Sequence, residues 1–233
     1  MPLVTTWRTT LAAAVSPASV TPILLLIVMT AAARPASAAR GPAAEGPAPG
    51  TAVAVLAGGC FWGVEAVFER LSGVSDVVSG FAGGQSWTAY YPVVGLGVTG
   101  HAESVQITYD PRQITFETLL DVFFTVAHDP TQRNRQGPDF GPQYRSVIFY
   151  ADEAQRRVAE AYIASLAASK AFDKPVVTTL EPFEGFYPAG AEHQDFVARN
   201  PTYPYVVAND LPKLDRLARR FPELVAGASA RRR

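Results

Sequence analysis

The order of apolar and polar residues predicts a strand, a glycine turn and a helix at the start of the folded part of the chain. The run Ala52 to Leu56, "AVAVL", is typical of a short strand and is followed by Gly58-Gly59. Beyond the turn, apolar residues recur at helical spacing, at Phe61, Val64, Phe68 and Leu71. Cys60 therefore lies where the predicted strand gives way to the predicted helix.

The rest of the pattern predicts further elements of both kinds. Strands are predicted at Val74 to Ser79, Ser104 to Tyr109, Arg145 to Tyr150 and Val176 to Leu180. Helices are predicted from Phe116 to Ala127, from a capping box at Asp152 to about Lys170, and near Leu211 to Phe221. The glycine-rich stretch Gly80 to Gly100 is too polar and too broken for a core element. Alternation of strands and helices with antiparallel features predicts an α+β fold, a sheet flanked by helices.

The first fifty residues differ from the rest in composition. Residues 23–33, "ILLLIVMTAAA", are apolar and precede Ala36-Ser37-Ala38, which fits a signal-peptidase site. We expect 1–38 to be a signal peptide, with an uncleaved anchor as the alternative, and 39–50 to be a flexible linker. A folded domain at 51–225 and a disordered basic tail at 226–233 would follow. Such a leader predicts export, to the periplasm or another compartment outside the cytoplasm.

Composition narrows the possible partners. The net charge of −1, with 18% charged and 48% hydrophobic residues, indicates a globular protein without a broad basic surface. We therefore expect no nucleic-acid partner and no stable membrane partner. Three histidines and one cysteine without tight ligand spacing also argue against a metal site.

Cys60 is the only cysteine of the 233 residues, so it cannot form an intramolecular disulfide. At a helix start, unpaired N–H groups and the helix dipole are expected to lower the thiol pKa and favour the reactive thiolate. The competing interpretation is a buried, inert cysteine packed by its aromatic neighbours. A second glycine-bounded polar cluster, Thr99-Gly100-His101-Ala102-Glu103, favours chemistry over packing.

Three segments together resemble the peptide methionine sulfoxide reductases of the A type, which act on the S epimer. They are "GGCFWGVE" at 58–65, "GVTGHAES" at 97–104 and "HDPTQRNRQGPDFGPQYRS" at 128–146. The resemblance covers about Val53 to Val207 and implies a two-layer α+β sandwich with a central mixed β-sheet flanked by helices. It also implies a role in protein repair and the oxidative stress response.

The resemblance implies a role for each matching residue. Cys60 would attack the sulfoxide sulfur and become a sulfenic acid, releasing methionine. Glu103 would act as the acid at the sulfoxide oxygen, with a pKa raised by its aromatic surroundings. The remaining positions are the methyl pocket of Phe61 and Trp62, the hydroxyls of Tyr91 and Tyr144, and the substrate-side residues Asp139 and His193. Thr88-Ala89-Tyr90-Tyr91 departs from the family pattern, so the first tyrosine is Tyr91 only on a gap-free count, with Tyr90 as the alternative.

Regeneration must differ from that of relatives with further cysteines. Where a tail cysteine might stand, the chain has Val206. We therefore predict a one-cysteine enzyme without a bound cofactor, in which an external thiol reduces the Cys60 sulfenic acid. Thioredoxin, glutaredoxin with glutathione, or dithiothreitol in vitro could supply that thiol, and the other partners would be oxidised proteins or peptides containing methionine sulfoxide.

Two other functions fit parts of the pattern. A cysteine hydrolase or acyl transferase would use His101 or His193 to activate Cys60. A non-catalytic module would bind oxidised methionine peptides without turning them over. Dithiothreitol-driven reduction of a methionine sulfoxide peptide distinguishes all three, because only the reductase turns over.

Overall fold

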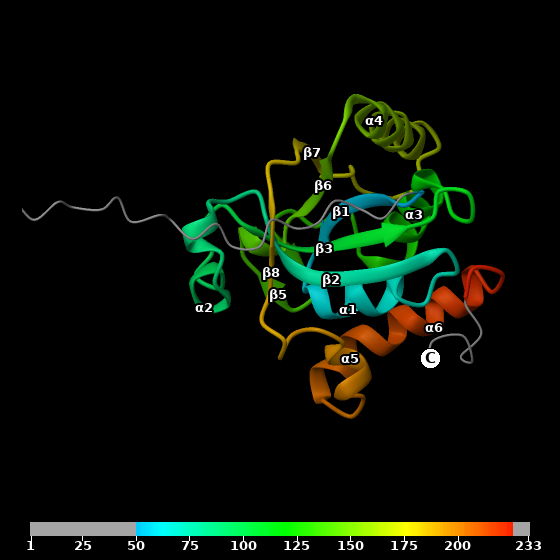
Figure 1. Cartoon of the computed structure of the whole chain (residues 1–233). Coiled ribbons are helices and arrows are strands. Elements are labelled where there is room, and N and C mark those ends of the chain that lie inside the picture. The colour runs from blue at the N-terminus through cyan, green and yellow to red at the C-terminus, as the bar shows by residue number, and fades with distance from the viewer. Residues whose placement is uncertain (1–49, 226–233) are drawn as a thin grey trace, which may run out of the picture. The chain divides into compact units, whose positions relative to one another are not determined.

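A six-stranded mixed sheet organises residues 50–225, the part of the chain that the computed structural model describes (Figure 1). The predicted signal peptide, nearly all of the predicted linker and the predicted basic tail lie outside the described residues. The strands are β1 (Ala52–Gly58), β2 (Val74–Ala82), β3 (Ala102–Tyr109), β4 (Arg135–Gln136), β5 (Asp139–Phe140), β6 (Ser146–Tyr150), β7 (Thr179–Pro182) and β8 (Phe186–Pro188). The α-helices are α1 (Phe61–Phe68), α2 (Tyr91–Val94), α3 (Phe116–Val122), α4 (Glu153–Ala168), α5 (Phe196–Arg199) and α6 (Leu211–Arg220). The other helical segments, of 3-10 or π type, are η1 (Ser86–Thr88), η2 (Phe123–Ala127), η3 (Pro142–Tyr144) and η4 (Val206–Asp210).

The sheet has the strand order β7-β6-β1-β3-β2-β8, and β4 and β5 form a separate two-stranded hairpin. All neighbours in the large sheet are antiparallel except β6 and β7, which are parallel. β1 lies in the middle, paired with β3 on one side and β6 on the other, so its C-terminal end is held in place by two neighbours. This confirms the expected α+β fold with a mixed sheet.

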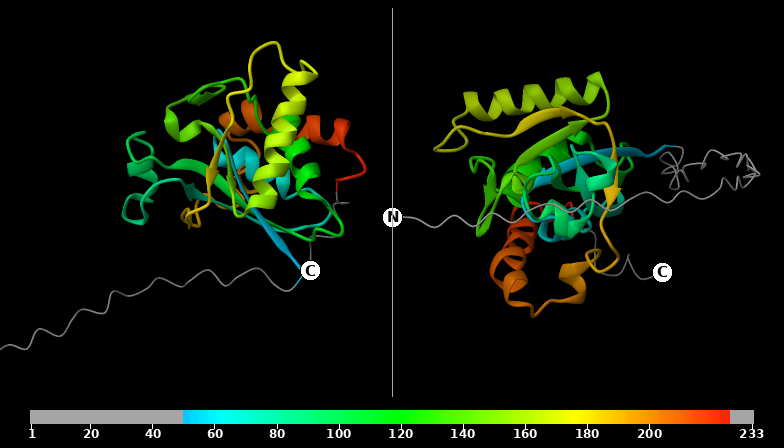
Figure 2. Two further views of the ribbon diagram at one scale, coloured as in Figure 1. Left: turned by 90° about the horizontal axis from the view of Figure 1, so that it is seen from above. Right: turned by 90° about the vertical axis from the view of Figure 1, so that its left-hand side faces the viewer.

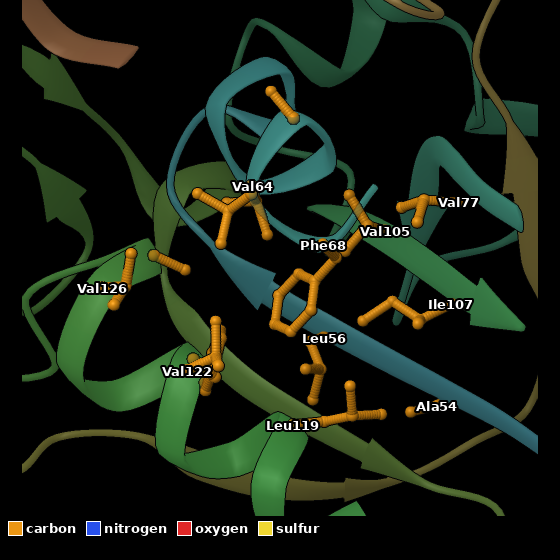
Figure 3. Packing of buried hydrophobic residues seen from close by; sticks show 14 of the residues in the cluster. Ala54, Leu56, Val64, Phe68, Val77, Val105, Ile107, Leu119, Val122 and Val126 are labelled. Carbon is orange, nitrogen blue, oxygen red and sulfur yellow. The ribbon is translucent and has the colours of Figure 1, made fainter. Parts of the chain in front are cut away.

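Alternation along the strands directs side chains to two faces of the sheet. Ala54 and Leu56 of β1 join Val105 and Ile107 of β3 in the large core beneath α1, α3 and α6, where Phe68 lies among them (Figure 3). The strand residues next in sequence to these point to the other face of the sheet. There they form a smaller cluster, against which Phe183 and Phe186 pack. That second cluster consists of Val55, Ala57, Ala82, Ala102, Val147 and Phe149. One residue of register therefore separates the two cores.

α4 runs beside α3 and the β6–β7 end of the sheet, while α6 packs against α1 (Figure 2). Asp152 caps α4 by accepting a hydrogen bond from the Gln155 N–H at 2.8 Å, as the predicted capping box requires. No helix within residues 50–225 is both long and apolar enough to span a bilayer.

The predicted strand at Val176 to Leu180 is wrong in its bounds. Pairing with β6 begins only at Thr179 and continues to Pro182. β7 is an edge strand whose residues are exposed or half-buried, so it lacks the alternation that would have marked its bounds. The prediction that Gly80 to Gly100 holds no core element is wrong at its start, because β2 continues to Ala82 and buries Phe81 and Ala82 in the cores. The rest of the stretch forms the short helices η1 and α2, and Val94 is the one buried residue of these two helices.

Candidate active site

Cys60 stands at the N-cap of α1, at the strand-to-helix turn that the sequence predicts. Gly59 adopts φ +93°, and a Cβ there would lie 2.5 Å from the Gln136 side chain. A Cβ on Gly58 would lie 2.9 Å from the Phe123 ring and 3.0 Å from the His128 ring. Both glycines are therefore needed to bring the end of β1 against the surrounding side chains and to fix where Cys60 begins the helix.

The thiol of Cys60 is nearly buried, with 6% of the residue exposed. The expected lowering of its pKa is wrong for the free protein. Burial raises the pKa of the Cys60 thiol well above its usual value, and the carboxylates of Glu103 and Asp210 raise it further. The Trp62 backbone N–H in the first turn of α1 and the Lys213 ammonium act in the opposite direction but are outweighed.

Glu103 lies on β3 and is 2% exposed. Its Oε2 accepts a hydrogen bond from the Phe61 N–H at 3.2 Å, which ties it to the residue that follows Cys60. Burial raises the pKa of Glu103 to about 8, although the Phe61 N–H acts against that rise. The side chain is therefore protonated at neutral pH and can donate a proton or a hydrogen bond.

Tyr91 and Tyr144 are half-buried and face the same group of residues. The pKa of each is raised, first by burial and then by the Glu103, Asp139 and Cys60 charges. The Tyr91 ring centroid lies 4.1 Å from that of His193, whereas Tyr90 is 65% exposed. The structure thus brings Tyr91, rather than Tyr90, to the group around Cys60.

Phe61 and Trp62 begin an aromatic wall beside the cysteine. The Trp62 ring stacks on Phe196 with centroids 3.8 Å apart, and its Nε1–H donates to His193 Nδ1 at 3.3 Å. Phe61 is fully buried, 6.1 Å from the Tyr91 ring centroid to centroid. A wall of this kind can hold an apolar methyl group and a thioether sulfur. Sequence patterns named every member except Phe196.

Two polar residues of the site, Tyr205 and Asp210, were not predicted from the sequence. The first of them bonds to Asp139, which was predicted. The Tyr205 hydroxyl donates a hydrogen bond to Asp139 Oδ2, a residue 66 positions away. Burial raises the pKa of Asp139, while the Tyr205 hydroxyl and Lys213 oppose the rise. Tyr205 also stands edge-on to the Trp62 ring at 5.9 Å. The aromatic-rich "NPTYPY" segment was the available signal.

Asp210 is the second residue that the sequence did not predict, and its position explains why residue 63 is a glycine. Asp210 is fully buried, its Oδ1 lies 3.4 Å from Lys213 Nζ, and its Oδ2 has no hydrogen-bond partner among the described residues. A Cβ on Gly63 would lie 2.1 Å from Asp210 Oδ1 and 2.7 Å from Lys213 Nζ. Gly63 therefore permits a close approach to the first turn of α1, and the Asp210–Lys213 pair is the group that approaches.

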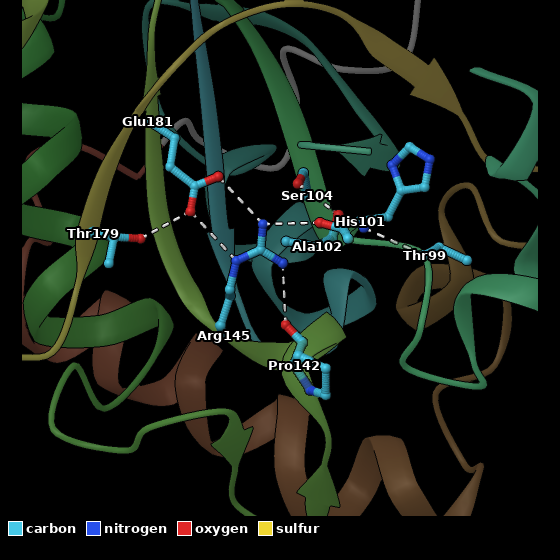
Figure 4. Close-up of polar contacts among 9 residues, drawn as sticks. Thr99, His101, Ala102, Ser104, Pro142, Arg145, Thr179 and Glu181 are labelled. Atoms are coloured by element: carbon cyan, nitrogen blue, oxygen red, sulfur yellow. Dashed lines mark hydrogen bonds and ion pairs between the residues drawn. The ribbon is translucent and has the colours of Figure 1, made fainter. Parts of the chain in front are cut away.

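Arg145 connects the segment before Glu103 with the segment that ends in Tyr144 (Figure 4). Its Nη2 donates to the Gly100 carbonyl at 3.0 Å and to Glu181 Oε2 at 3.3 Å, and its Nη1 donates to the Pro142 carbonyl at 3.2 Å. The Arg145 guanidinium therefore joins both loops to each other and to β7.

No histidine makes a hydrogen bond to the Cys60 sulfur among residues 50–225. His101 Nε2 lies 3.1 Å from the Gln85 carbonyl, and His193 Nδ1 accepts from Trp62. His128 uses both ring nitrogens, with the Phe123 carbonyl and with Ser146 Oγ, and burial lowers its pKa to about 4. The cysteine–histidine pair that a hydrolase would need is therefore not formed.

Comparisons with known proteins identify the family. The family model described as peptide methionine sulfoxide reductase matches residues 52–224. The chain is 55% identical over 177 residues to "Peptide methionine sulfoxide reductase MsrA 2" of Mesorhizobium japonicum, covering 76% of this chain and 91% of that protein. It is 50% identical over 175 residues to the MsrA of Natronomonas pharaonis, covering 75% and 98%.

Solved structures give the same result. Reduced Mxr1 from Saccharomyces cerevisiae aligns with a TM-score of 0.62 at 33% identity, covering 67% of this chain and 90% of that one. Methionine sulfoxide reductase A of Corynebacterium diphtheriae aligns with a TM-score of 0.57 at 38% identity, covering 67% and 78%. The chain belongs to the peptide methionine sulfoxide reductase family, and it is an enzyme that reduces methionine sulfoxide.

Proposed function

We propose that Cys60 is the nucleophile in the reduction of methionine-S-sulfoxide, free or in proteins, and that Glu103 supplies the proton to the sulfoxide oxygen. The supporting observation is the pairing of a buried cysteine at a helix start with a carboxyl group that burial keeps protonated, linked by the Phe61 N–H to Glu103 bond of 3.2 Å. An acid is needed because oxygen gains negative charge while sulfur is attacked.

The chemistry balances as an oxygen transfer. The Cys60 sulfur attacks the sulfoxide sulfur, and the oxygen passes to Cys60, which becomes a sulfenic acid. The substrate sulfur is reduced by two electrons, the cysteine sulfur is oxidised by two, and methionine leaves. Phe61 and Trp62 hold the methyl group, and the hydroxyls of Tyr91 and Tyr144 face the oxygen beside Glu103.

An external thiol completes the cycle, because the chain has no second cysteine. One thiolate attacks the sulfenic acid, water leaves and a mixed disulfide forms; a second thiolate then releases the Cys60 thiolate. Asp139, held by Tyr205, and His193, held by Trp62, border the site on the substrate side.

A single-turnover experiment tests the proposal. Purified protein is mixed with a peptide that contains both epimers of methionine sulfoxide, without added thiol. The amount of peptide methionine formed is then measured. We expect close to one equivalent per Cys60, taken from the S epimer, and none with Cys60→Ser. Several equivalents from thiol-free protein, or full activity in Cys60→Ser, would show the proposal to be wrong.

We also propose that the protein acts outside the cytoplasm in repair of oxidised proteins. The support is the apolar run 23–33 followed by Ala36-Ser37-Ala38. Mass spectrometry of the protein from the periplasmic fraction should find a chain that begins at Ala39. A chain that begins at Met1 in the cytoplasmic fraction contradicts this.

A further inference from the structure

Large apolar side chains are exposed on the segment that precedes Glu103 in the sequence. Trp87, Tyr90, Leu96 and Val98 are each between 65% and 83% exposed, and we call these four side chains the apolar rim. They make up half of the eight large apolar side chains that are exposed within residues 50–225. Exposed apolar residues that are gathered rather than scattered mark a surface that binds another molecule.

The apolar rim lies on the outer side of a compact turn. The Tyr90 carbonyl accepts hydrogen bonds from the Val93 and Val94 N–H groups at 2.9 Å, and the Leu96 N–H donates to the Val93 carbonyl at 3.2 Å. Val94 is buried in the large core, and Tyr91 packs against that core. The segment thus buries its inner apolar residues and holds the apolar rim in water on a backbone of fixed shape.

Contacts with η3 fix this segment beside the second site tyrosine. The buried Gln143 donates through Nε2 to the Gly95 carbonyl at 3.1 Å. Gly97 adopts φ +74°, and a Cβ there would lie 3.0 Å from Gln143 Oε1. Leu96, between these two glycines, is therefore held next to η3, and η3 ends at Tyr144.

Tyr91 connects the apolar rim to the residues around Cys60. Its ring centroid lies 6.1 Å from that of Phe61 and 4.1 Å from that of His193. The next residue before it in the sequence is the exposed Tyr90. Apolar surface therefore continues from the proposed methyl pocket, through Tyr91, to the outer side of α2.

The chemistry of this segment favours an apolar partner. No lysine, arginine, aspartate or glutamate occurs between Asp76 and Glu103. A charged group placed against the apolar rim would lose hydration without gaining an ion pair, whereas an apolar side chain gains from burial there. Methionine usually lies among apolar residues in a protein core, and its oxidation to the sulfoxide disrupts such a core. An oxidised methionine in a disrupted core thus comes with exposed apolar neighbours.

We propose that the apolar rim binds apolar side chains of the substrate polypeptide next to the methionine sulfoxide. The enzyme accordingly prefers oxidised methionines in unfolded, apolar segments over those with polar neighbours. The inference rests on the proposed function and names the class of substrate for that site. The partner is the substrate chain because the apolar rim continues into the pocket where its sulfoxide reacts.

The test compares two heptapeptides with methionine sulfoxide at the centre. One has leucine at the two positions on either side and the other has serine there, and both carry a lysine at each blocked end. We measure kcat/KM for the full-length protein with dithiothreitol. The leucine peptide should react at least about tenfold better, mainly through KM, because burial of flanking side chains adds binding energy. The preference should persist at high salt, since no ion pair contributes to it.

Variants of exposed residues locate the effect. The double variant Trp87→Ser/Leu96→Ser should lower the ratio of leucine to serine peptide several-fold. Val158→Ser is the matched control, because Val158 is also an exposed apolar residue but lies on α4, apart from α2 (Figure 1). N-Acetyl-methionine sulfoxide has no flanking side chains, so its rate in each variant corrects for any change in the reactivity of Cys60.

Equal kcat/KM for the two peptides in the wild-type protein would overturn the inference, and so would an equal loss of preference in Val158→Ser and the double variant. Sedimentation velocity tests a second copy of the chain as the occupant. A wild-type dimer that becomes monomeric in the double variant would assign the apolar rim to a contact between copies and would also overturn the inference. If N-acetyl-methionine sulfoxide is not reduced, the proposed function fails separately, and binding of the two peptides is then compared by calorimetry.

Discussion

Replacing Glu103 by glutamine should slow catalysis and at the same time stabilise the protein, increasingly so as pH rises. Glutamine keeps the size of the side chain and an oxygen that can accept from the Phe61 N–H. It cannot transfer a proton to the substrate oxygen. We expect the single-turnover rate of methionine release to fall by about 10²- to 10⁴-fold, the usual contribution of general acid catalysis.

The stability gain follows from the pKa of the buried carboxyl. Folding raises the pKa of Glu103 from 4.5 to about 8, chiefly by burial. Between these two values the folded protein holds a proton that the unfolded chain has released, so the free energy of unfolding falls as pH rises through this window. Each pH unit costs about 1.4 kcal/mol, and the loss between pH 5 and pH 7 is about 2.5 kcal/mol. Glutamine has no such loss.

Urea unfolding of both proteins at pH 5, 6 and 7 measures this difference. The free energy of unfolding of Glu103→Gln minus that of the wild type should grow by about 2.5 kcal/mol over the range, whatever its value at pH 5. Glu65 is the matched control. Burial also raises its pKa to about 8, but its side chain lies outside the site, so Glu65→Gln should show a pH-dependent gain and keep its activity. A constant or shrinking gap for Glu103→Gln would mean that the folded protein holds Glu103 ionised, and its role as the acid would be refuted.

Three further substitutions test the contacts around Cys60. Gly63→Ala places a Cβ 2.1 Å from Asp210 Oδ1 and should lower the free energy of unfolding by about 1–3 kcal/mol in urea; an unchanged midpoint would contradict the close approach. Tyr205→Phe removes the donor to Asp139, and kcat/KM for a sulfoxide peptide should fall about tenfold, mainly through KM; an unchanged KM would argue against a substrate-side role. Arg145→Gln loses the bonds that join the two loops, so kcat should fall while circular dichroism stays native; unchanged kcat would show that the loops hold without it.

The elements of the fold that sequence predicts best are those buried along most of their length. β1 is apolar on both faces because its alternate residues enter two different cores, and α1 buries seven of its eight residues, so each is marked by a nearly continuous apolar run. β7 and β8 are short edge strands with half-exposed residues, and their pairing depends on β6 and β2 rather than on their own pattern. The intrinsic strand propensity of a segment does not show which other strand it will pair with.

The candidate site divides in the same way. Motifs led to Cys60 and Glu103, but the direction of the Cys60 pKa shift was wrong, because a helix start lowers it by a local effect that burial outweighs. Tyr205 and Asp210 act on residues far away in the sequence, and no local pattern shows which tyrosine or aspartate will arrive there. A glycine at position 63 leaves space against the first turn of α1, but the sequence does not show that Asp210 fills that space.

The raised pKa values of Cys60 and Glu103 are compatible with catalysis once the protons of the whole step are counted. Oxygen transfer from a neutral sulfoxide to a neutral thiol gives a neutral thioether and a neutral sulfenic acid, so no net proton enters or leaves the site. The buried thiol and the buried carboxyl both start protonated, and no unpaired charge has to be buried before the substrate arrives. In the proposed step, Glu103 gives its proton to the oxygen as the sulfur attacks and regains one from the thiol. Glutamine preserves the neutrality and the shape but breaks this exchange, which is why stability and rate should move in opposite directions in Glu103→Gln.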